Sequence, residues 1–284
     1  MSELNIGVTT LSIILLIIFL ALVQVNLYSL QNSFALSINP MSDKGLSIRP
    51  VQFGAPPRFF DSSSFKGTCT LSHDATELKG TPQQMEGPYF VDEMPNRSDI
   101  RSDTKDGLER KGVPLHLKIH VYNVVNGLCV PLEGAKVDIW HTDSQGIYSA
   151  VSDMGTAGSD FLRGFQITNK IGSVEFMTIF PGWYEGRTIH IHDKVRMLNG
   201  LQTKLEWTSQ LYFNNSINQQ IHQQPPYSNH GSPQTTNEED IIYGRASIDG
   251  LIERNSGDKL LVNLTGDGPG YVGEFNIVLN ADKR

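Results

Sequence analysis

Beyond Gly67 the chain is a series of short runs of alternating or β-branched residues, separated by Gly, Asn, Asp and Pro. Runs of this kind, bounded by turn-forming residues, are typical of β-strands. No convincing helix of 12 or more residues appears among them. The fold class that follows is all-β, most economically a two-sheet antiparallel β-sandwich. Strands are predicted at 115–125, 135–140, 161–168, 173–179, 188–197, 204–213, 243–248, 259–264 and 274–279.

Two connecting segments have distinctive compositions. Asn169-Lys170-Ile171-Gly172 lies between two predicted strands and has the residues of a hairpin turn, with Gly172 at a position that needs a positive φ. Residues 214–240 are rich in Asn, Gln, Pro and Ser. A segment of that length and composition indicates a long surface loop or a lid.

The beginning of the chain differs from the rest. Residues 6–30 contain no charged side chain, and about 20 apolar residues suffice to span a bilayer. We therefore predict a transmembrane anchor or signal segment over residues 1–30, a flexible polar linker over 31–66 and the β-sandwich domain over 67–284. The protein is expected to be membrane-anchored or secreted, with this domain outside the cytoplasm. A buried core helix is the alternative, and cleavage of the segment stays open.

Composition and charge narrow the class of protein. The chain has 30 acidic and 23 basic side chains, a net charge of -7, which argues against a protein that binds nucleic acid through its phosphates. Hydrophobic residues make up 39%, which is enough for one sizeable core and excludes global disorder. The two cysteines, Cys69 and Cys129, are consistent with one disulfide or with two buried thiols. The oligomeric state stays open.

Candidate chemistry is densest between Asp138 and Val195. His190 and His192 are two residues apart on a predicted strand, so both imidazoles leave the same face and can share one metal ion. Alone, such a pair is as consistent with a solvated strand face. Two tyrosines strengthen the metal hypothesis: Tyr148 follows a turn that contains a glycine, and Tyr184 precedes His190 by six residues. Each tyrosine could instead be a core aromatic with its hydroxyl at the rim.

These segments resemble the intradiol ring-cleavage dioxygenases, the catechol and protocatechuate 3,4-dioxygenase-like enzymes that open catechols with ferric iron. The segments are DIWHTDSQGIYS, FLRGFQIT and TIFPGWYEGRTIHIHDKV. Upstream, the resemblance to the single-chain, secreted-type branch extends over Cys69-Thr70-Leu71, 86–90, 97–101 and 112–115. It runs from about Cys69 to near the C-terminus.

The resemblance implies a site and a reaction. Tyr148, Tyr184, His190 and His192 would be the four protein ligands of Fe(III), an ion that hard anionic oxygen donors favour. A catechol-type substrate and O2 would be the small-molecule partners. The ring would open between its two hydroxyl-bearing carbons to give a cis,cis-muconate-type diacid, and Tyr184 would also act as a base. Which catechol derivative is used stays open.

Two further residues are candidates for catalysis. By the same resemblance Arg187, three residues before His190, would stabilise negative charge on the substrate carbon. A surface salt bridge is the alternative. Gln166 is predicted to orient a ligand or an oxygen bound to the iron, with a bond to the backbone as its alternative. His141 is predicted to be structural or to support a metal ligand.

Two other functions remain possible from the sequence. One is a non-catalytic exported transthyretin-like β-sandwich binding module that begins at Pro131-Leu132-Glu133-Gly134-Ala135. The other is a zinc hydrolase built on His190 and His192. No further acidic or histidine ligand has support in the sequence, and tyrosinate is a rare zinc ligand. One departure from the family pattern is Thr142, where secreted-type relatives often carry Cys.

Overall fold

The computed structural model describes residues 80–126, 128–200, 202–248, 251–254, 256–266 and 269–279. The predicted anchor or signal segment, the linker and Cys69 lie outside these residues. Among the described residues, no helix is both long and apolar enough to cross a membrane. Cys129 is disulfide-bonded, and the sequence has only one other cysteine. The sequence leaves open a disulfide or two buried thiols, and the structure has Cys129 in a disulfide.

Two sheets form the body of the domain. The first, here called the β1 sheet, is five-stranded with the order β10-β11-β1-β2, and β5 also pairs with β1. The second, the β6 sheet, is four-stranded with the order β4-β3-β6-β7. The β1 sheet comprises β1 (Pro114–Val125), β2 (Leu128–Pro131), β5 (Ser173–Ile179), β10 (Asn263–Thr265) and β11 (Tyr271–Leu279). The β6 sheet comprises β3 (Lys136–Trp140), β4 (Arg163–Ile167), β6 (His190–Asn199) and β7 (Gln202–Tyr212).

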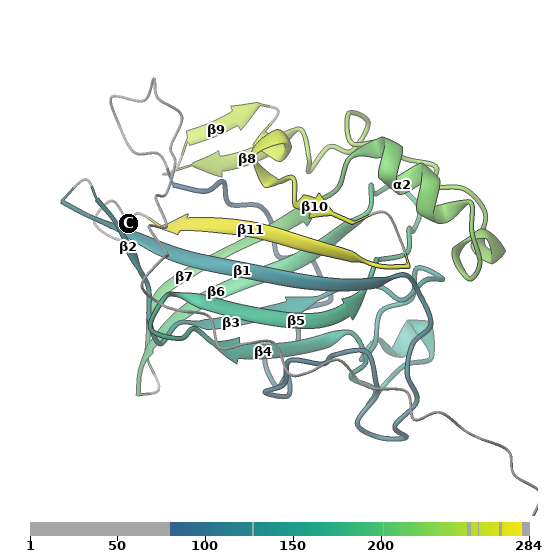
Figure 1. Cartoon of the computed structure of the whole chain (residues 1–284), viewed down its shortest axis with the longest axis horizontal. Coiled ribbons are helices and arrows are strands. Elements are labelled where there is room, and N and C mark those ends of the chain that lie inside the picture. The colour runs from purple at the N-terminus through teal and green to yellow at the C-terminus, as the bar shows by residue number, and fades with distance from the viewer. Residues whose placement is uncertain are drawn as a thin grey trace, which may run out of the picture. The chain divides into compact units, whose positions relative to one another are not determined.

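Smaller elements complete the described residues. A two-stranded ribbon consists of β8 and β9, and the segment after β7 contains one α-helix. Their bounds are β8 (Arg245–Ile248), β9 (Leu251–Arg254), α2 (Asn215–His222), η1 (Ser152–Met154), η2 (Tyr227–His230) and η3 (Ser256–Leu260). In Figure 1 α2 lies beside one end of the two sheets.

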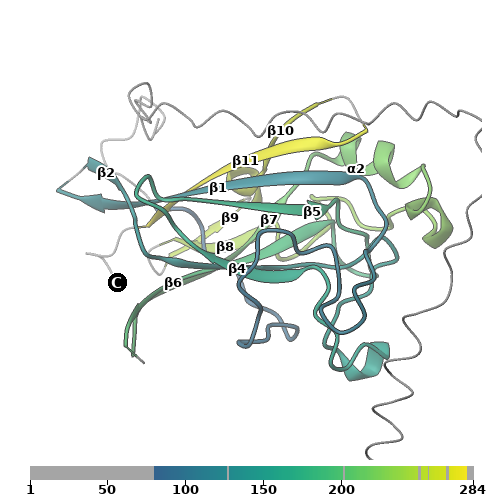
Figure 2. The same ribbon diagram turned by 60° about the horizontal axis from the view of Figure 1, so that its bottom comes forward.

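The core lies between the two sheets, which Figure 2 shows stacked one above the other. Alternate side chains of β1, from Leu115 to Val121, are fully buried, as expected for a strand with one face on a core. β3, β6 and β7 contribute opposing residues such as Ile139, Ile191 and Trp207. This packing leaves the other face of the β6 sheet available for the polar residues of β6.

Most predicted strands are confirmed, and the differences concern pairing. β1 and β11 pair in parallel, so the sheet is not wholly antiparallel. β2 and β9 were not predicted, and the strand expected at 259–264 is instead η3 followed by β10. The turn ending at Gly172 has the expected positive φ of 71°, but it joins β4 to β5, which lie in different sheets. It is therefore a connection between sheets and not a hairpin.

The segment 214–240, predicted as a long loop or lid, is partly ordered into α2 and η2. Ile221 of α2 and Tyr227 of η2 are buried and belong to the core between the sheets. The Tyr227 hydroxyl donates to the Phe180 carbonyl at 2.6 Å. This half of the segment is therefore packed structure.

Candidate metal centre

The strand β6 carries the two histidines on the face of the β6 sheet that points away from the core. Ile191 and Val195 point into the core, so the alternation of the strand places His190 and His192 on the opposite face. Trp140 of β3 lies opposite His192 in the register. Both histidines are nonetheless buried, because other segments cover them.

Four donor atoms converge at this place. His190 Nε2 lies 3.1 Å from His192 Nε2, 3.4 Å from the Tyr148 hydroxyl and 3.3 Å from the Tyr184 hydroxyl. Ligand atoms about 2 Å from one metal ion, at angles of about 90–120°, are separated by about 3–3.5 Å. The two imidazoles and two phenols therefore have the spacing of a single metal site.

The loops that carry the two tyrosines interlock through glycines. Gly146, two residues before Tyr148, has a φ of 77°, and an added Cβ would lie 2.1 Å from the Trp183 carbonyl oxygen. A Cβ on Gly182 would likewise lie 2.2 Å from the Asp143 carbonyl oxygen. Only glycine allows these backbones to approach so closely. The contact places Tyr148 and Tyr184 side by side, with ring centroids 5.8 Å apart.

A buried arginine holds the loop that carries Tyr148 through hydrogen bonds. Arg163 on β4 donates to the Ser149 carbonyl at 2.6 Å and to the Tyr89 carbonyl at 2.5 Å. These bonds join Ser149, the residue after Tyr148, to the segment around Tyr89, which packs over Tyr148. Tyr89 packs on Tyr148 with ring centroids 4.6 Å apart.

Each histidine ring is oriented by a different contact. His190 Nδ1 lies 2.6 Å from the Thr188 carbonyl oxygen, which can only accept, so Nδ1 carries the proton. The lone pair of Nε2 is then directed toward the tyrosines. His192 stacks on Trp140 with centroids 4.8 Å apart and an interplanar angle of 7°. His192 Nδ1 is buried and has no hydrogen-bond partner among the residues that the structure describes.

The electrostatics suit a cation. Burial, and then the charge of Arg187, lowers the pKa of His190 and His192 well below the usual range, so both imidazoles are neutral. Burial likewise raises the pKa of Tyr184 and raises that of Tyr148 well above 10. The phenols ionise at neutral pH only beside a strong positive charge. The donor set thus fits a highly charged, oxygen-preferring metal ion.

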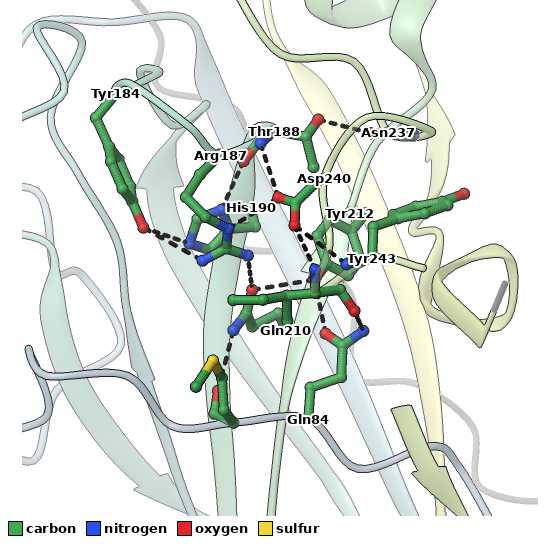
Figure 3. A network of polar contacts seen from close by, with 12 residues as sticks. Gln84, Tyr184, Arg187, Thr188, His190, Gln210, Tyr212, Asn237, Asp240 and Tyr243 are labelled. Atoms are coloured by element: carbon green, nitrogen blue, oxygen red, sulfur yellow. Dashed lines mark hydrogen bonds and ion pairs between the residues drawn. The ribbon is translucent and has the colours of Figure 1, made fainter. Parts of the chain in front are cut away.

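Arg187 lies at the edge of this cluster and is largely buried (Figure 3). Its Nε donates to Asp240 Oδ2 at 2.8 Å, and one terminal nitrogen lies 3.4 Å from the Tyr184 hydroxyl. The other terminal nitrogen donates to Gln210 Oε1. Because Asp240 is fully buried, the ion pair is not the surface salt bridge considered as an alternative.

Gln166 is not part of the cluster, which corrects its predicted role. It pairs with Val137 in the register, and its side-chain amide donates to the Glu175 carbonyl. Gln210 of β7 lies at the site instead, opposite His192 in the register. Its amide also donates to the Met85 carbonyl at 3.0 Å. The backbone alternative for Gln166 is thus the one observed.

Sequence reasoning also missed other polar residues around Arg187. The Tyr212 hydroxyl donates to Gln84 Oε1 at 2.7 Å, and Gln84 donates to the Ile242 carbonyl at 2.8 Å. The register of β6 and β7 places Tyr212 opposite His190, which a pairing prediction could have revealed. Gln84 and Asp240 lie outside the strands, and no sequence pattern marks them.

The structure describes the surroundings of His141 and of the histidine pair considered for zinc. Both nitrogens of His141 have partners, the Thr142 carbonyl at 2.8 Å and Thr178 Oγ1 at 2.7 Å, which fits the structural one of its two predicted roles. In the described part of the chain, no three His, Cys, Asp or Glu side chains are grouped as metal ligands. The donors that join His190 and His192 are phenols, which are not usual zinc ligands.

Comparisons with known proteins show which family this chain resembles. A family model described as Dioxygenase matches residues 85–217. Catechol 1,2-dioxygenase 1 of Acinetobacter lwoffii is 34% identical over 112 residues, which cover 37% of this chain and 32% of that protein. Chlorocatechol 1,2-dioxygenase of Pseudomonas putida is 26% identical over 167 residues, 52% of this chain and 60% of that protein. The match thus spans less than two thirds of the length of these curated relatives.

One solved structure is matched over nearly its whole length by this chain. An intradiol ring-cleavage dioxygenase from Tetranychus urticae has 32% sequence identity and a TM-score of 0.59. The alignment covers 72% of this chain and 96% of that one.

Proposed function

This chain belongs to the intradiol ring-cleavage dioxygenase family, and from that premise we propose that it opens the ring of a catechol-type substrate with O2. The bond broken is the one between the two hydroxyl-bearing carbons, and the product is a cis,cis-muconate-type diacid. Both oxygen atoms enter the product, so no other oxidant or reductant is needed. The observation that carries the proposal is the convergence of two imidazoles and two phenols within 3.1–3.4 Å of His190 Nε2.

The proposed metal is ferric iron, held by Tyr148, Tyr184, His190 and His192. Two phenolates and two neutral imidazoles are hard and borderline donors that suit a trivalent ion better than a divalent one. When bound, the iron would coordinate the catechol oxygens and withdraw electron density from the ring, which makes the ring reactive toward O2.

The surroundings of the two tyrosines favour Tyr184 as the base. Tyr148 is fully buried, whereas Tyr184 is partly exposed and faces the Arg187 guanidinium. A phenolate oxygen of Tyr184 can accept the proton of a substrate hydroxyl and then remain hydrogen-bonded to Arg187. The Tyr148 hydroxyl accepts no hydrogen bond from a cationic side chain among the described residues, and we propose that it stays a ligand.

Arg187 is proposed to stabilise charge on the substrate. Its guanidinium is held beside Tyr184, so its positive charge lies close to any ring bound at the metal. Negative charge that develops on the ring carbon as oxygen attacks is stabilised most by a fixed cation in a site of low dielectric constant. Aromatic side chains provide that environment, since Tyr89, Phe90 and Trp140 pack around Tyr148.

The proposal is tested on purified, iron-loaded protein. We expect about one iron per chain, a red-brown colour from charge transfer between tyrosinate and ferric iron, and consumption of one O2 per catechol with loss of the aromatic absorption. A panel of catechols with different substituents then identifies the preferred substrate. A colourless protein that consumes no O2 with any of them would contradict the proposal and favour the binding-module alternative.

We also propose that the domain works outside the cytoplasm, anchored or secreted. The uncharged segment 6–30 supports this location, and so does the disulfide of Cys129, because disulfides persist mainly in oxidising compartments. Cell fractionation, followed by protease treatment of intact cells that express the full chain, tests it. A soluble, protease-protected cytoplasmic enzyme would refute the location and leave the iron chemistry untouched.

A further inference from the structure

Asp240 lies where the segment after η2 returns to the metal centre, and its carboxylate is fully buried. It accepts four hydrogen bonds. Oδ1 accepts from the backbone N–H groups of Ile242 at 2.7 Å and Tyr243 at 3.2 Å, which closes a local turn. Oδ2 accepts from Arg187 Nε at 2.8 Å and from the Thr188 N–H at 2.9 Å. One oxygen thus shapes the turn, and the other reaches the site (Figure 3).

The bond at Nε determines how the Arg187 guanidinium is turned. A guanidinium is planar, so fixing Nε against Asp240 sets the directions in which the two terminal nitrogens point. Those nitrogens face the Tyr184 hydroxyl and Gln210 Oε1. Without a partner at Nε, the flexible side chain could rotate away from Tyr184. Asp240 therefore selects the orientation in which Arg187 faces the metal centre.

On the basis of the proposed function, we propose that Asp240 is a positioning residue of the dioxygenase, which acts on turnover through Arg187 and not through iron binding or substrate affinity. Neither the sequence pattern nor the strand pairing assigns it a role. Its place in the site follows only from the turn that brings it against Arg187.

Asp240 also balances the charge of Arg187. The fully buried Asp240 carboxylate lies 2.8 Å from Arg187 Nε and forms an ion pair with the guanidinium. The pair adds no net charge to the centre. Removal of the carboxylate leaves one uncompensated positive charge 3.4 Å from the Tyr184 oxygen, a change that the iron spectrum can report.

Iron binding does not depend on Asp240 alone. Thr188, whose carbonyl holds His190 Nδ1, has a second anchor because its hydroxyl donates to Asn237 Oδ1 at 2.7 Å. Asn237 in turn donates to the Phe213 carbonyl at 2.9 Å. Loss of the Asp240 carboxylate therefore leaves the support of His190 in place, and the effect on Arg187 can be separated from an effect on the ligands.

The test is a double-mutant cycle in the full chain with Asp240→Asn, Arg187→Gln and both together. For Asp240→Asn we expect unchanged iron content, catechol binding without O2 within about threefold of wild type, and kcat lowered about 10- to 100-fold, the scale of a misplaced catalytic group. In the Arg187→Gln background, the same change should alter kcat by less than about threefold, because the two residues act as one unit.

A readout besides activity is the visible absorption of the iron-loaded protein without substrate. An uncompensated guanidinium stabilises the adjacent Tyr184 phenolate, so the charge-transfer band of Asp240→Asn should move to shorter wavelength. Tyr243→Phe is the matched control. Tyr243 belongs to the same turn, and this substitution removes the 2.7 Å hydrogen bond from its hydroxyl to Asp258. It changes no contact of Arg187. It should leave both the band and kcat unchanged.

Three results would overturn the inference: wild-type kcat in Asp240→Asn, losses that multiply in the double variant, or an equal loss in Tyr243→Phe. If Asp240→Asn does not fold, Asp240→Glu takes its place, since it keeps the charge but moves the carboxylate by one methylene. Iron retention with lowered kcat is again the expected result. A wild-type protein that cleaves no catechol refutes the proposed function instead, and is recognised before any variant is compared.

Discussion

The two ends of one face of β6 show how the same strand geometry serves two purposes. His190 and His192 lie at one end, and Lys194 and Arg196 continue the alternation at the other. Lys194 pairs with Glu86 and Glu206, and Arg196 pairs with Asp92 and Asp138. No ion pair among the described residues includes either histidine of the metal centre. At the cationic end both charges are neutralised by carboxylates. At the other end His190 faces the phenols of Tyr148 and Tyr184, as in the proposed metal site.

The covering segment accounts for much of the difference. The stretch from Glu86 to Asp92 crosses both ends of the face. Gly87 lies over His192, so that a Cβ there would be 3.5 Å from the imidazole carbon Cε1. Carboxylates of the same stretch reach the cations, and Phe90 lies between, with its ring 4.4 Å from Lys194 Nζ. The side chains opposite each end, more than the strand itself, decide which end can bind a metal.

Removal of a ligand at the metal end should have the largest effect. His192→Ala deletes one of the four convergent donors, and we expect iron affinity to fall by more than about 100-fold, since even weaker changes around a ligand cost 10- to 100-fold. Colour and activity should be lost together. Tyr184→Phe should retain some iron with a shifted absorption band, because three donors remain. Metal analysis after dialysis measures both, and full activity of His192→Ala would contradict the assignment.

At the cationic end the expected loss is of stability alone. Arg196→Met leaves the fully buried Asp138 carboxylate with Lys136, at 3.3 Å, as its remaining ion-pair partner in the described part of the chain. Breaking a buried ion pair by removing one partner costs about 3 kcal/mol, measured here by urea unfolding. The folded fraction should keep its iron and its kcat. Arg101→Met, which breaks an exposed pair with Asp99, is the matched control and should cost less than about 1 kcal/mol.

His141 is a third buried histidine. It differs from His190 and His192 because protein groups bond to both of its nitrogens. Burial lowers the pKa of His141 to about 4. In the unfolded chain a histidine titrates near 6.5, so between pH 6.5 and 4 the unfolded state binds the extra proton. The contribution of the neutral His141 to the free energy of unfolding is therefore fully present above pH 6.5, and it falls by about 3 kcal/mol as the pH drops to 4. Urea unfolding of iron-loaded protein across this range measures it. In His141→Gln this component should disappear, and an unchanged pH dependence would refute it.

Sequence reasoning located the strands and the ligands better than the network around them. Alternation reveals which residues of a strand share a face, so His190 and His192 could be paired without a structure. The tyrosines needed the family resemblance, because nothing local distinguishes a ligand tyrosine from a core one. Gln166 and Gln210 both lie on predicted strands, and only the register shows that Gln210 lies opposite His192.

The remaining features depend on contacts between segments far apart in sequence. The parallel pairing of β1 with β11 joins the two ends of the domain and has no local signature. Asp240 is one acid in a polar loop until the turn brings it to Arg187, 53 residues away. The segment expected as a strand at 259–264 begins as η3, because tertiary packing overrides its apolar pattern.

The smallest expected effect concerns the glycine that covers His192. Gly87 has a φ of 76°, and a Cβ at 3.5 Å from the imidazole is an ordinary van der Waals contact. Gly87→Ala should therefore cost about 1 kcal/mol from backbone strain alone, with iron content and colour unchanged. Gly87→Asn should cost less, because asparagine tolerates the left-handed region better than alanine. Thermal unfolding measures both costs, and loss of iron from Gly87→Ala would show that the imidazole needs more space than this contact indicates.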